Sequence, residues 1–411
     1  MNFACPSCAH DVLPFLDLGK QPYGNVFVKP GTEGQERLNP LKLAYCPHCH
    51  LVSQYEPPSN EGLREDYTNY KYVPWGKTLA EHYDRIAREL VSRIGPREGI
   101  RIVDIGSNDG TLLGGILRAR PSAKVLGVEP AVNISNVAAA KGVPTIRDFF
   151  TKDTAKLIAE HSGKADVVTF TQVLQHMPHI SDLRETVKEL LAPNGMLMVE
   201  GRYMGESLRS GAWDSFYLEM LQEFSLISME SFLAPIGLKV FDAVEDPIYG
   251  GSLRIWAAFD RPAEKSVNAI RSREIADGLT NVETYLRFAQ RAKATASELS
   301  NAIKDLNKEG KVVAAYGASS TGATLLNFAG LTKEDVKYIV DENPMKQGFL
   351  SPGSHIPIVP LGELKRHPVD AILLLAWRLR DEILPKIRTH SGPETQLIVP
   401  IPDVRSSAIG K

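Results

Sequence analysis

All four cysteines of this 411-residue chain lie near its N-terminus, in the two pairs Cys5-Pro-Ser-Cys8 and Cys46-Pro-His-Cys49. A CxxC pair holds two thiolates on one tight turn, so two such pairs can supply the four sulfur ligands of a tetrahedral Zn²⁺ site. Four protein ligands would leave the ion no open coordination position. We therefore expect the metal to be structural rather than catalytic.

Two disulfides, a redox CxxC and four inert core thiols are the alternatives for the same cysteines. No secretory signal precedes Cys5, so an oxidising compartment, and with it a pair of disulfides, is not favoured. A redox CxxC normally follows a strand of a βαβ unit and does not come in duplicate. The spacing favours zinc.

Charge and hydropathy narrow the range of partners. The formal net charge is −2, and acidic and basic residues are interspersed without a basic stripe, so a nucleic-acid partner is not expected. The longest apolar runs, such as Ala371-Ile-Leu-Leu-Leu-Ala-Trp377, are too short to cross a bilayer and predict buried strands. We expect a cytoplasmic protein, monomeric or homodimeric, that acts on a small molecule or serves as a soluble scaffold.

Hydrophobic periodicity divides the chain into three parts. Residues 1–70 are rich in Pro, Gly and polar turns, and a metal would compensate for their small core. Residues 71–262 begin with a helical pattern and continue with alternating strands and helices, which predicts a mainly parallel doubly wound sheet. Residues 263–411 begin with a continuous helical linker and continue with a second α/β set. The predicted α/β fold is a zinc-binding module followed by two Rossmann-like domains.

The segment Val103-Asp-Ile-Gly-Ser-Asn-Asp-Gly-Thr-Leu-Leu113 is the strongest candidate for a cofactor site. Its glycines let the backbone approach a ligand at the carboxyl end of a strand. The next strand ends at Glu129, whose carboxylate can accept both hydroxyls of a ribose. The full GxGxxG of NAD sites is missing, which favours S-adenosylmethionine (SAM); a glycine turn without a ligand is the alternative. The predicted SAM-binding residues are Asp104, Gly106, Ser107, Asn108, Gly110, Glu129, Asp148, Phe149 and Gln172.

Two further polar stretches follow predicted strands. Thr171-Gln-Val-Leu-Gln-His176 comes at a strand end beside the cofactor motif and faces the expected reaction centre, although His176 alone is equally well interpreted as a structural loop histidine. In the second α/β set, Gly317 to Gly322 could hold a phosphate at a helix N-terminus or merely allow close packing. Asp341-Glu-Asn-Pro344 and Lys346 could belong to a nucleotide site or to a solvated turn.

In combination, these segments resemble the SAM-dependent nucleotide-sugar C-methyltransferases that carry an N-terminal zinc-binding domain. The resemblance covers nearly the whole chain. Its segments are the two CxxC pairs, Ile105 to Gly110, Pro247 to Arg254, Tyr316 to Ala318, Asp341 to Gly348, Pro352 to Pro357, Trp377 to Ile383 and Pro400 to Pro402. It implies that a proton next to a ketone of a nucleotide-linked deoxysugar is removed and that the enolate attacks the methyl group of SAM. Such a reaction needs a base and donors for the enolate oxygen.

The family's Tyr-His-Glu-His motif reads Tyr217-Leu218-Glu219-Met220 in this chain, so both histidines are replaced. If enolate methylation is retained, the resemblance implies Glu219 or His176 as the base, with Tyr217 and Tyr72 orienting the sugar. An O- or N-methyltransferase and a non-catalytic SAM-binding relative are the alternatives. The substrate-binding residues that it implies are Tyr70, Arg254, Tyr316, Gly317, Ala318, Ser319, Asp341, Asn343, Lys346, Trp377 and Glu382.

Overall fold

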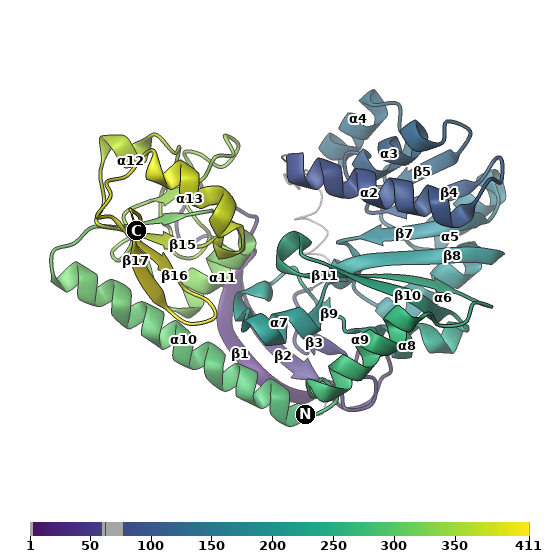
Figure 1. Ribbon diagram of the computed structural model, residues 1–411, viewed down its shortest axis with the longest axis horizontal. Coiled ribbons are helices and arrows are strands. Elements are labelled where there is room, and N and C mark those ends of the chain that lie inside the picture. Colours follow the sequence, from purple (N-terminus) through teal and green to yellow (C-terminus); the bar gives the residue numbers. More distant parts are fainter. Residues whose placement is uncertain (1–2, 60–61, 63–76, 411) are drawn as a thin grey trace.

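A computed structural model of the chain describes residues 3–59, 62 and 77–410. The strands of these residues form three sheets, of four, seven and six strands. In Figure 1 the seven-stranded sheet lies in the right lobe, the six-stranded sheet in the left lobe, and the four-stranded sheet below and between them. The predicted fold class, a zinc-binding module with two Rossmann-like α/β parts, is confirmed.

The four-stranded sheet is antiparallel and draws on two distant parts of the sequence. Its strands, in order, are β1 (Leu13–Pro22), β2 (Leu38–Tyr45), β3 (Val52–Gln54) and β9 (Gln222–Glu223). The short strand β9 pairs with β3 through Val52 and Ser53. The N-terminal module is therefore built into the rest of the molecule by shared backbone hydrogen bonds.

The seven-stranded sheet has the order β10-β11-β8-β7-β4-β5-β6, in which β11 runs antiparallel to its neighbours β10 and β8 and the other pairs are parallel. The strands predicted from 101, 124, 165 and 195 are all present. The bounds are β4 (Arg101–Ile105), β5 (Lys124–Val128), β6 (Thr145–Ile146), β7 (Ala165–Thr171), β8 (Leu191–Arg202), β10 (Lys239–Asp246) and β11 (Ser252–Ala258).

Helices cover both faces of this sheet because successive strand residues point to opposite sides. Ile102 packs in one core with α2 and α3, and its neighbour Val103 packs in another core with α5, α6 and α8. The helices are α2 (Lys77–Ile94), α3 (Thr111–Ala119), α4 (Val132–Ala140), α5 (Lys152–Ser162), α6 (Ile180–Leu190), α7 (Met204–Ser210) and α8 (Leu226–Leu233). Short 3₁₀ turns are η1 (Leu174–His176), η2 (Trp213–Ser215), η3 (Ala234–Ile236) and η4 (Ile248–Gly250).

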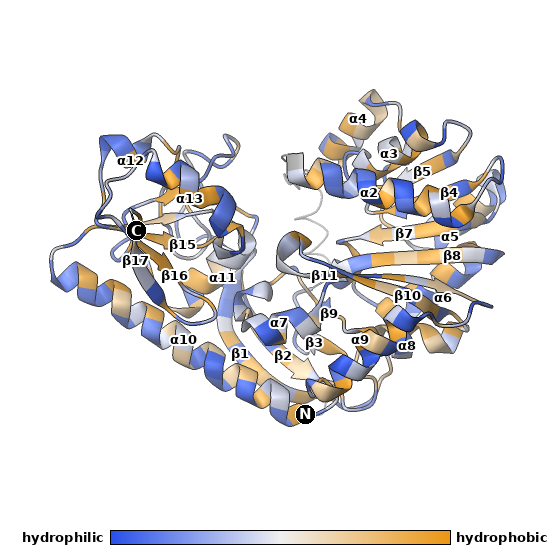
Figure 2. Cartoon of the chain, in the orientation of Figure 1, coloured by the Kyte–Doolittle hydropathy of each residue, from blue (hydrophilic) through white to orange (hydrophobic). Residues whose placement is uncertain are grey.

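The predicted continuous helical linker is two helices, α9 (Lys265–Ala276) and α10 (Val282–Lys308). The chain turns at Gly278, whose φ of +78° suits glycine, and the Asn281 side chain caps α10 by accepting a hydrogen bond from the Glu283 amide. Figure 2 shows apolar positions recurring along α10, which packs against β1 and the left lobe.

The six-stranded sheet has the order β14-β13-β12-β15-β16-β17, parallel except for the edge strand β17. Its strands are β12 (Val313–Tyr316), β13 (Ile339–Val340), β14 (Ile358–Val359), β15 (Ala371–Leu374), β16 (Gln396–Val399) and β17 (Arg405–Ala408). The helices are α11 (Ser320–Phe328), α12 (Glu363–Arg366) and α13 (Arg380–Arg388), with the 3₁₀ turn η5 (Trp377–Leu379).

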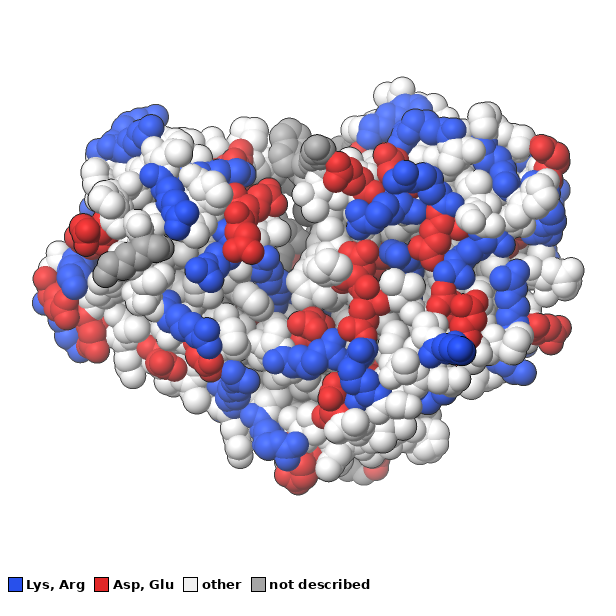
Figure 3. Space-filling view, viewed as in Figure 1, with Lys and Arg blue, Asp and Glu red and all other residues white. Residues whose placement is uncertain are grey.

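One core joins the three parts. Phe15 and Leu18 of β1 pack in a single cluster with Trp213 of the right lobe, Phe288 of α10 and Leu326 of α11. On the face drawn in Figure 3, acidic and basic side chains are interspersed. Within the described ranges, no helix has the length and hydropathy needed to span a membrane.

Candidate functional site

A cavity of about 1200 Å³ lies between the two lobes. Residues at or just beyond the carboxyl ends of β4, β5 and β7 line it from the right lobe, and residues after β12 and β13 line it from the left lobe. Ligands of open α/β sheets bind at this end of the strands. The cavity therefore brings two potential ligand sites face to face.

The wall of the right lobe is built around two buried carboxylates. Glu129 accepts hydrogen bonds from the amides of Asn108, at 3.0 Å, and Ala131, at 2.8 Å. Asp104 accepts a hydrogen bond from the Thr169 hydroxyl at 2.6 Å. Burial raises the pKa of Asp104 to about 7 and raises the pKa of Glu129 above its usual range.

This wall fits the nucleoside of SAM. Gly106 has a φ of +66°, and a Cβ there would lie 2.5 Å from Val173, so the turn requires glycine. The buried Ser107 hydroxyl has no hydrogen-bond partner among the described residues, which leaves it for a polar ligand. Carboxylates here can accept ribose hydroxyls and balance the positive charge of SAM.

The nine residues predicted to bind SAM divide into two groups. Seven line the cavity: Asp104, Gly106, Ser107, Asn108, Glu129, Phe149 and Gln172. The other two are outside the described lining. Gly110, with a φ of +74°, is the N-cap of α3, and the exposed Asp148 accepts a hydrogen bond from the Phe149 amide at 2.7 Å.

His176 and Tyr217 line the cavity near a contact between the lobes, because Glu219 holds Gly24, which packs closely against Ser320 of α11. His176 Nδ1 is 2.7 Å from the backbone oxygen of Glu219, and because a carbonyl only accepts, Nδ1 carries the proton. His176 Nε2 is then the lone-pair nitrogen, 3.5 Å from the Tyr217 hydroxyl. Burial lowers the pKa of His176 to about 4, so the imidazole is neutral near pH 7 and able to accept a proton.

Glu219 holds a loop of the N-terminal module. Its two carboxylate oxygens accept the backbone amides of Gly24, at 3.2 Å, and Asn25, at 3.1 Å. Burial raises its pKa. Glu219 is not among the described residues that line the cavity, whereas Asn25 and Phe27 are.

The wall of the left lobe repeats the strand–turn–helix arrangement with different charges. Gly317 has a φ of +99° and passes so close to Ala376 that a Cβ would lie 2.6 Å from it. Asp341 accepts the Ala318 amide at 2.9 Å and pairs with Lys346 Nζ at 3.2 Å. The predicted substrate residues that line the cavity here are Tyr316, Gly317, Ser319, Asp341, Asn343, Lys346 and Glu382.

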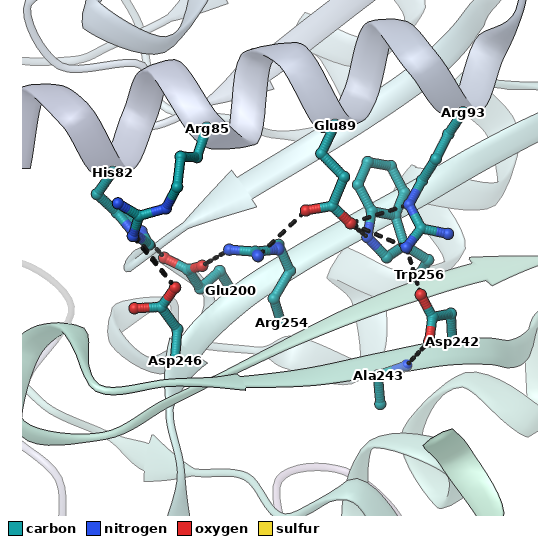
Figure 4. A network of polar contacts seen from close by, with 10 residues as sticks. All are labelled: His82, Arg85, Glu89, Arg93, Glu200, Asp242, Ala243, Asp246, Arg254 and Trp256. Atoms are coloured by element: carbon teal, nitrogen blue, oxygen red, sulfur yellow. Dashed lines mark hydrogen bonds and ion pairs between the residues drawn. The ribbon is translucent and has the colours of Figure 1, made fainter. Parts of the chain in front are cut away.

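Three predicted substrate residues lie outside the cavity lining. Ala318 and Trp377 lie just behind the lining, and the Trp377 indole donates to Asp214 at 2.9 Å. Arg254 lies under α2, where it pairs with Glu200 at 2.6 Å and Glu89 at 3.1 Å. Figure 4 shows these pairs as part of a network that ties α2 to β8, β10 and β11. Tyr70 and Tyr72 fall outside the described residues.

Several residues that line the cavity were not predicted from the sequence. They are Asn25, Phe27, Arg202, Tyr249 and Arg378. Arg202 ends strand β8, so the argument that selected His176 would also have selected it. Asn25 and Phe27 carry no local signal, because only the packing of the N-terminal module brings them to the cavity.

The four cysteine sulfurs fit a zinc ion. They lie within 4.8 Å of one another, with Cys5–Cys49 and Cys8–Cys46 Sγ separations of 3.5 Å. Tetrahedral ligation at a Zn–S bond of about 2.3 Å brings sulfurs to roughly 3.8 Å. Four thiolates close the coordination sphere, so this zinc is structural.

Comparison with known proteins identifies the family. Family models match in three consecutive stretches: a zinc binding domain at residues 5–63, a methyltransferase domain at 79–243 and a C-methyltransferase C-terminal domain at 247–402. C-methyltransferase NovU of Streptomyces niveus is 32% identical over 407 residues, which cover 98% of this chain and 96% of NovU. The chain belongs to this C-methyltransferase family. It is a SAM-dependent methyltransferase with a structural zinc site.

More distant relatives match a smaller share of the chain. The ubiquinone biosynthesis O-methyltransferase of Xylella fastidiosa is 27% identical over 136 residues, 32% of this chain and 54% of that protein. Among solved structures, magnesium protoporphyrin IX methyltransferase of Synechocystis with bound SAH has a TM-score of 0.38 and 17% identity, and covers 49% of this chain and 100% of that chain.

Proposed function

We propose that this C-methyltransferase methylates a carbon next to a ketone on a nucleotide-linked deoxysugar. The observation that carries the proposal is the neutral His176, whose Nε2 lies beside the Tyr217 hydroxyl near a contact between the lobes. A base held between a cofactor wall and a substrate wall meets the geometric requirement for proton abstraction during methyl transfer.

The left wall supports a nucleotide as the anchor of the substrate. Ser319 accepts a hydrogen bond from the Gly322 amide and caps α11, whose first turn lines the cavity. Lys346 adds a positive charge 3.2 Å from Asp341. A helix N-terminus with a nearby lysine suits the phosphates of a nucleotide, and the Asp341 and Glu382 carboxylates suit hydroxyl groups.

His176 is better arranged than Glu219 to take the proton. His176 has its Nδ1–H engaged by the Glu219 carbonyl, which fixes both the tautomer and the ring orientation. Glu219 uses both carboxylate oxygens on backbone amides, so its role in this proposal is to position the loop 24–27 and, through its carbonyl, His176. SAM, when bound, supplies the methyl group as an electrophile.

A hydroxyl or amine acceptor is the second candidate, because the positions of both family histidines are apolar and buried. Leu218 is 0% exposed and Met220 is 1% exposed, so neither offers a second base. An oxygen or nitrogen acceptor needs less help in losing its proton. His176 alone would then suffice.

The two candidates differ in the atom that receives the methyl group. We would incubate the protein with ¹³C-methyl SAM and a panel of nucleotide-linked keto-deoxysugars, and expect the product's NMR spectrum to show a methyl bonded to carbon. His176→Gln should lower turnover by about 100-fold or more, with the exposed His161→Gln as the matched control. A methyl group on oxygen or nitrogen would refute the first candidate.

A further inference from the structure

Arg202 is a charged side chain of the cavity wall. It is the last residue of β8, in register with Ser252 of β11. It lines the cavity together with His176 and Tyr217. Its guanidinium is close enough to lower the pKa of His176, after the larger effect of burial, and to oppose the rise in the pKa of Tyr217 that burial causes.

The charge of Arg202 has no direct acidic partner in the described part of the chain. Among the described residues its one hydrogen bond runs from Nη1 to the Ser215 hydroxyl, at 2.9 Å. Arg378, which lines the cavity from the left lobe, is by contrast held by Asp214, with Nη2–Oδ1 at 2.8 Å and Nη1–Oδ2 at 3.0 Å.

Two acidic side chains, Glu223 and Asp214, act on Arg202 through their charge without a direct ion pair among the described residues. Glu223 is fully buried, its Oε1 accepts a hydrogen bond from Ser207, its Oε2 has no hydrogen-bond partner among the described residues, and burial raises its pKa. Asp214 forms an ion pair with Arg378, and the positive charge of Arg378 repels that of Arg202. A guanidinium that faces a cavity with unused N–H donors is suited to an oxyanion of the ligand.

We propose that Arg202 is the catalytic residue that holds the oxygen which becomes negative when the acceptor loses its proton. This rests on the proposed carbon methylation. The carbon–hydrogen bond next to the ketone breaks and its proton passes to His176 Nε2. The electron pair forms a carbon–carbon double bond, the carbonyl oxygen becomes the enolate oxygen, and Arg202 donates to it. The acceptor class is thus a carbon acid whose ketone faces β8.

Hydrogen exchange tests this step apart from methyl transfer. With S-adenosylhomocysteine in place of SAM and thymidine-diphosphate 4-keto-6-deoxyglucose as the probe, wild type in D₂O should incorporate deuterium next to the ketone. Arg202→Gln should slow this exchange by about 100-fold, as expected for loss of one oxyanion donor. KM should stay within about threefold, Arg202→Lys should recover part of the rate, and the exposed Arg88→Gln serves as the matched control.

The pH profile gives a readout that a structural defect would not produce. Loss of the Arg202 charge should raise the pKa of His176, so the acid limb of the exchange rate should move to higher pH in Arg202→Gln and stay in place in Arg202→Lys. Wild type without exchange would overturn the enolate proposal itself. Exchange in wild type with an unchanged rate in Arg202→Gln, or a rise in KM alone, would overturn only the role of Arg202.

Discussion

The two walls of the cavity use the same backbone device with different charges. In each lobe a buried strand runs into a glycine turn, at Gly106 and at Gly317, and the next strand is followed by a carboxylate, Glu129 or Asp341. On the right wall the second charged group is Asp104, another carboxylate, and on the left wall it is Lys346, which pairs with Asp341.

The comparison shows that the backbone provides the same ligand-binding turn in both lobes, whereas the side chains determine which charge of ligand each wall favours. The turn and the helix N-terminus offer amides to a ligand in both lobes. Two buried carboxylates with raised pKa values favour a cationic ligand with hydroxyls, which fits SAM. A lysine beside the carboxylate favours phosphates, which fits the proposed nucleotide.

Asp214→Asn should have the largest effect, because it disturbs the contact that fixes one wall against the other. Asp214 is 0% exposed and receives hydrogen bonds from both Arg378 and Trp377 of the left lobe. Removing its charge leaves Arg378 without its acidic partner, which we expect to lower the free energy of unfolding by about 3–5 kcal/mol. Urea unfolding measures this, with the exposed Asp305→Asn as control; a loss below about 1 kcal/mol would contradict it.

Glu129→Ala should weaken SAM binding by about 100-fold, because it removes a charged acceptor for two hydroxyls. The affinity for thymidine diphosphate should not change, since that probe binds the other wall. Calorimetric titration with each ligand separates the two. Glu129→Gln keeps one acceptor oxygen, so its affinity for SAM should fall less. The affinity of the exposed control Glu160→Ala should not change. Equal losses for both ligands would mean that the two walls are not independent.

Much of this comparison could be predicted from the sequence, because each wall depends on local patterns. A buried strand followed by glycines and an acidic residue indicates a strand end, and parallel strands bring such ends to one edge. This pattern predicts Asp104, Glu129 and Asp341, whereas Tyr316 is implied only by the resemblance to the family. These predictions do not require the order of the strands within each sheet.

The contacts across the walls could not be predicted in this way. Asn25 lies near Glu219 because β1 packs against α10 and α11, and Arg378 lies near Asp214 because the left lobe docks on η2. These partners are 194 and 164 residues apart, and no local periodicity reports their proximity. Strand β9 was missed for the same reason, since two residues are too few for a strand pattern.

Lys346→Met should weaken the binding of thymidine diphosphate and leave SAM binding unchanged, the reverse of Glu129→Ala, and the effect should be smaller. The loss of one charge-assisted hydrogen bond of about 1.5 kcal/mol corresponds to about a tenfold rise in the Kd for thymidine diphosphate. SAM binding should stay unchanged. The exposed Lys365→Met on α12 removes a charge from the same lobe away from the cavity and should have no effect. An unchanged Kd for thymidine diphosphate would show that the charge of Lys346 does not contribute to nucleotide binding, and would contradict the proposed electrostatic difference between the walls.

A pH dependence of similar size belongs to the right wall. Burial raises the pKa of Asp104 to about 7, so its carboxyl is mostly ionised at pH 8 and mostly protonated at pH 6. SAM is cationic and favours the ionised form, so its affinity should fall by about tenfold as the pH drops from 8 to 6. Glu129, whose pKa is also raised, would act in the same direction. Asp104→Asn should bind SAM more weakly and with a flatter pH profile, measured by calorimetry at pH 8, 7 and 6. A wild-type affinity that does not change over this range would show that the negative charge of Asp104 does not contribute to SAM binding, and that the walls differ in shape more than in charge.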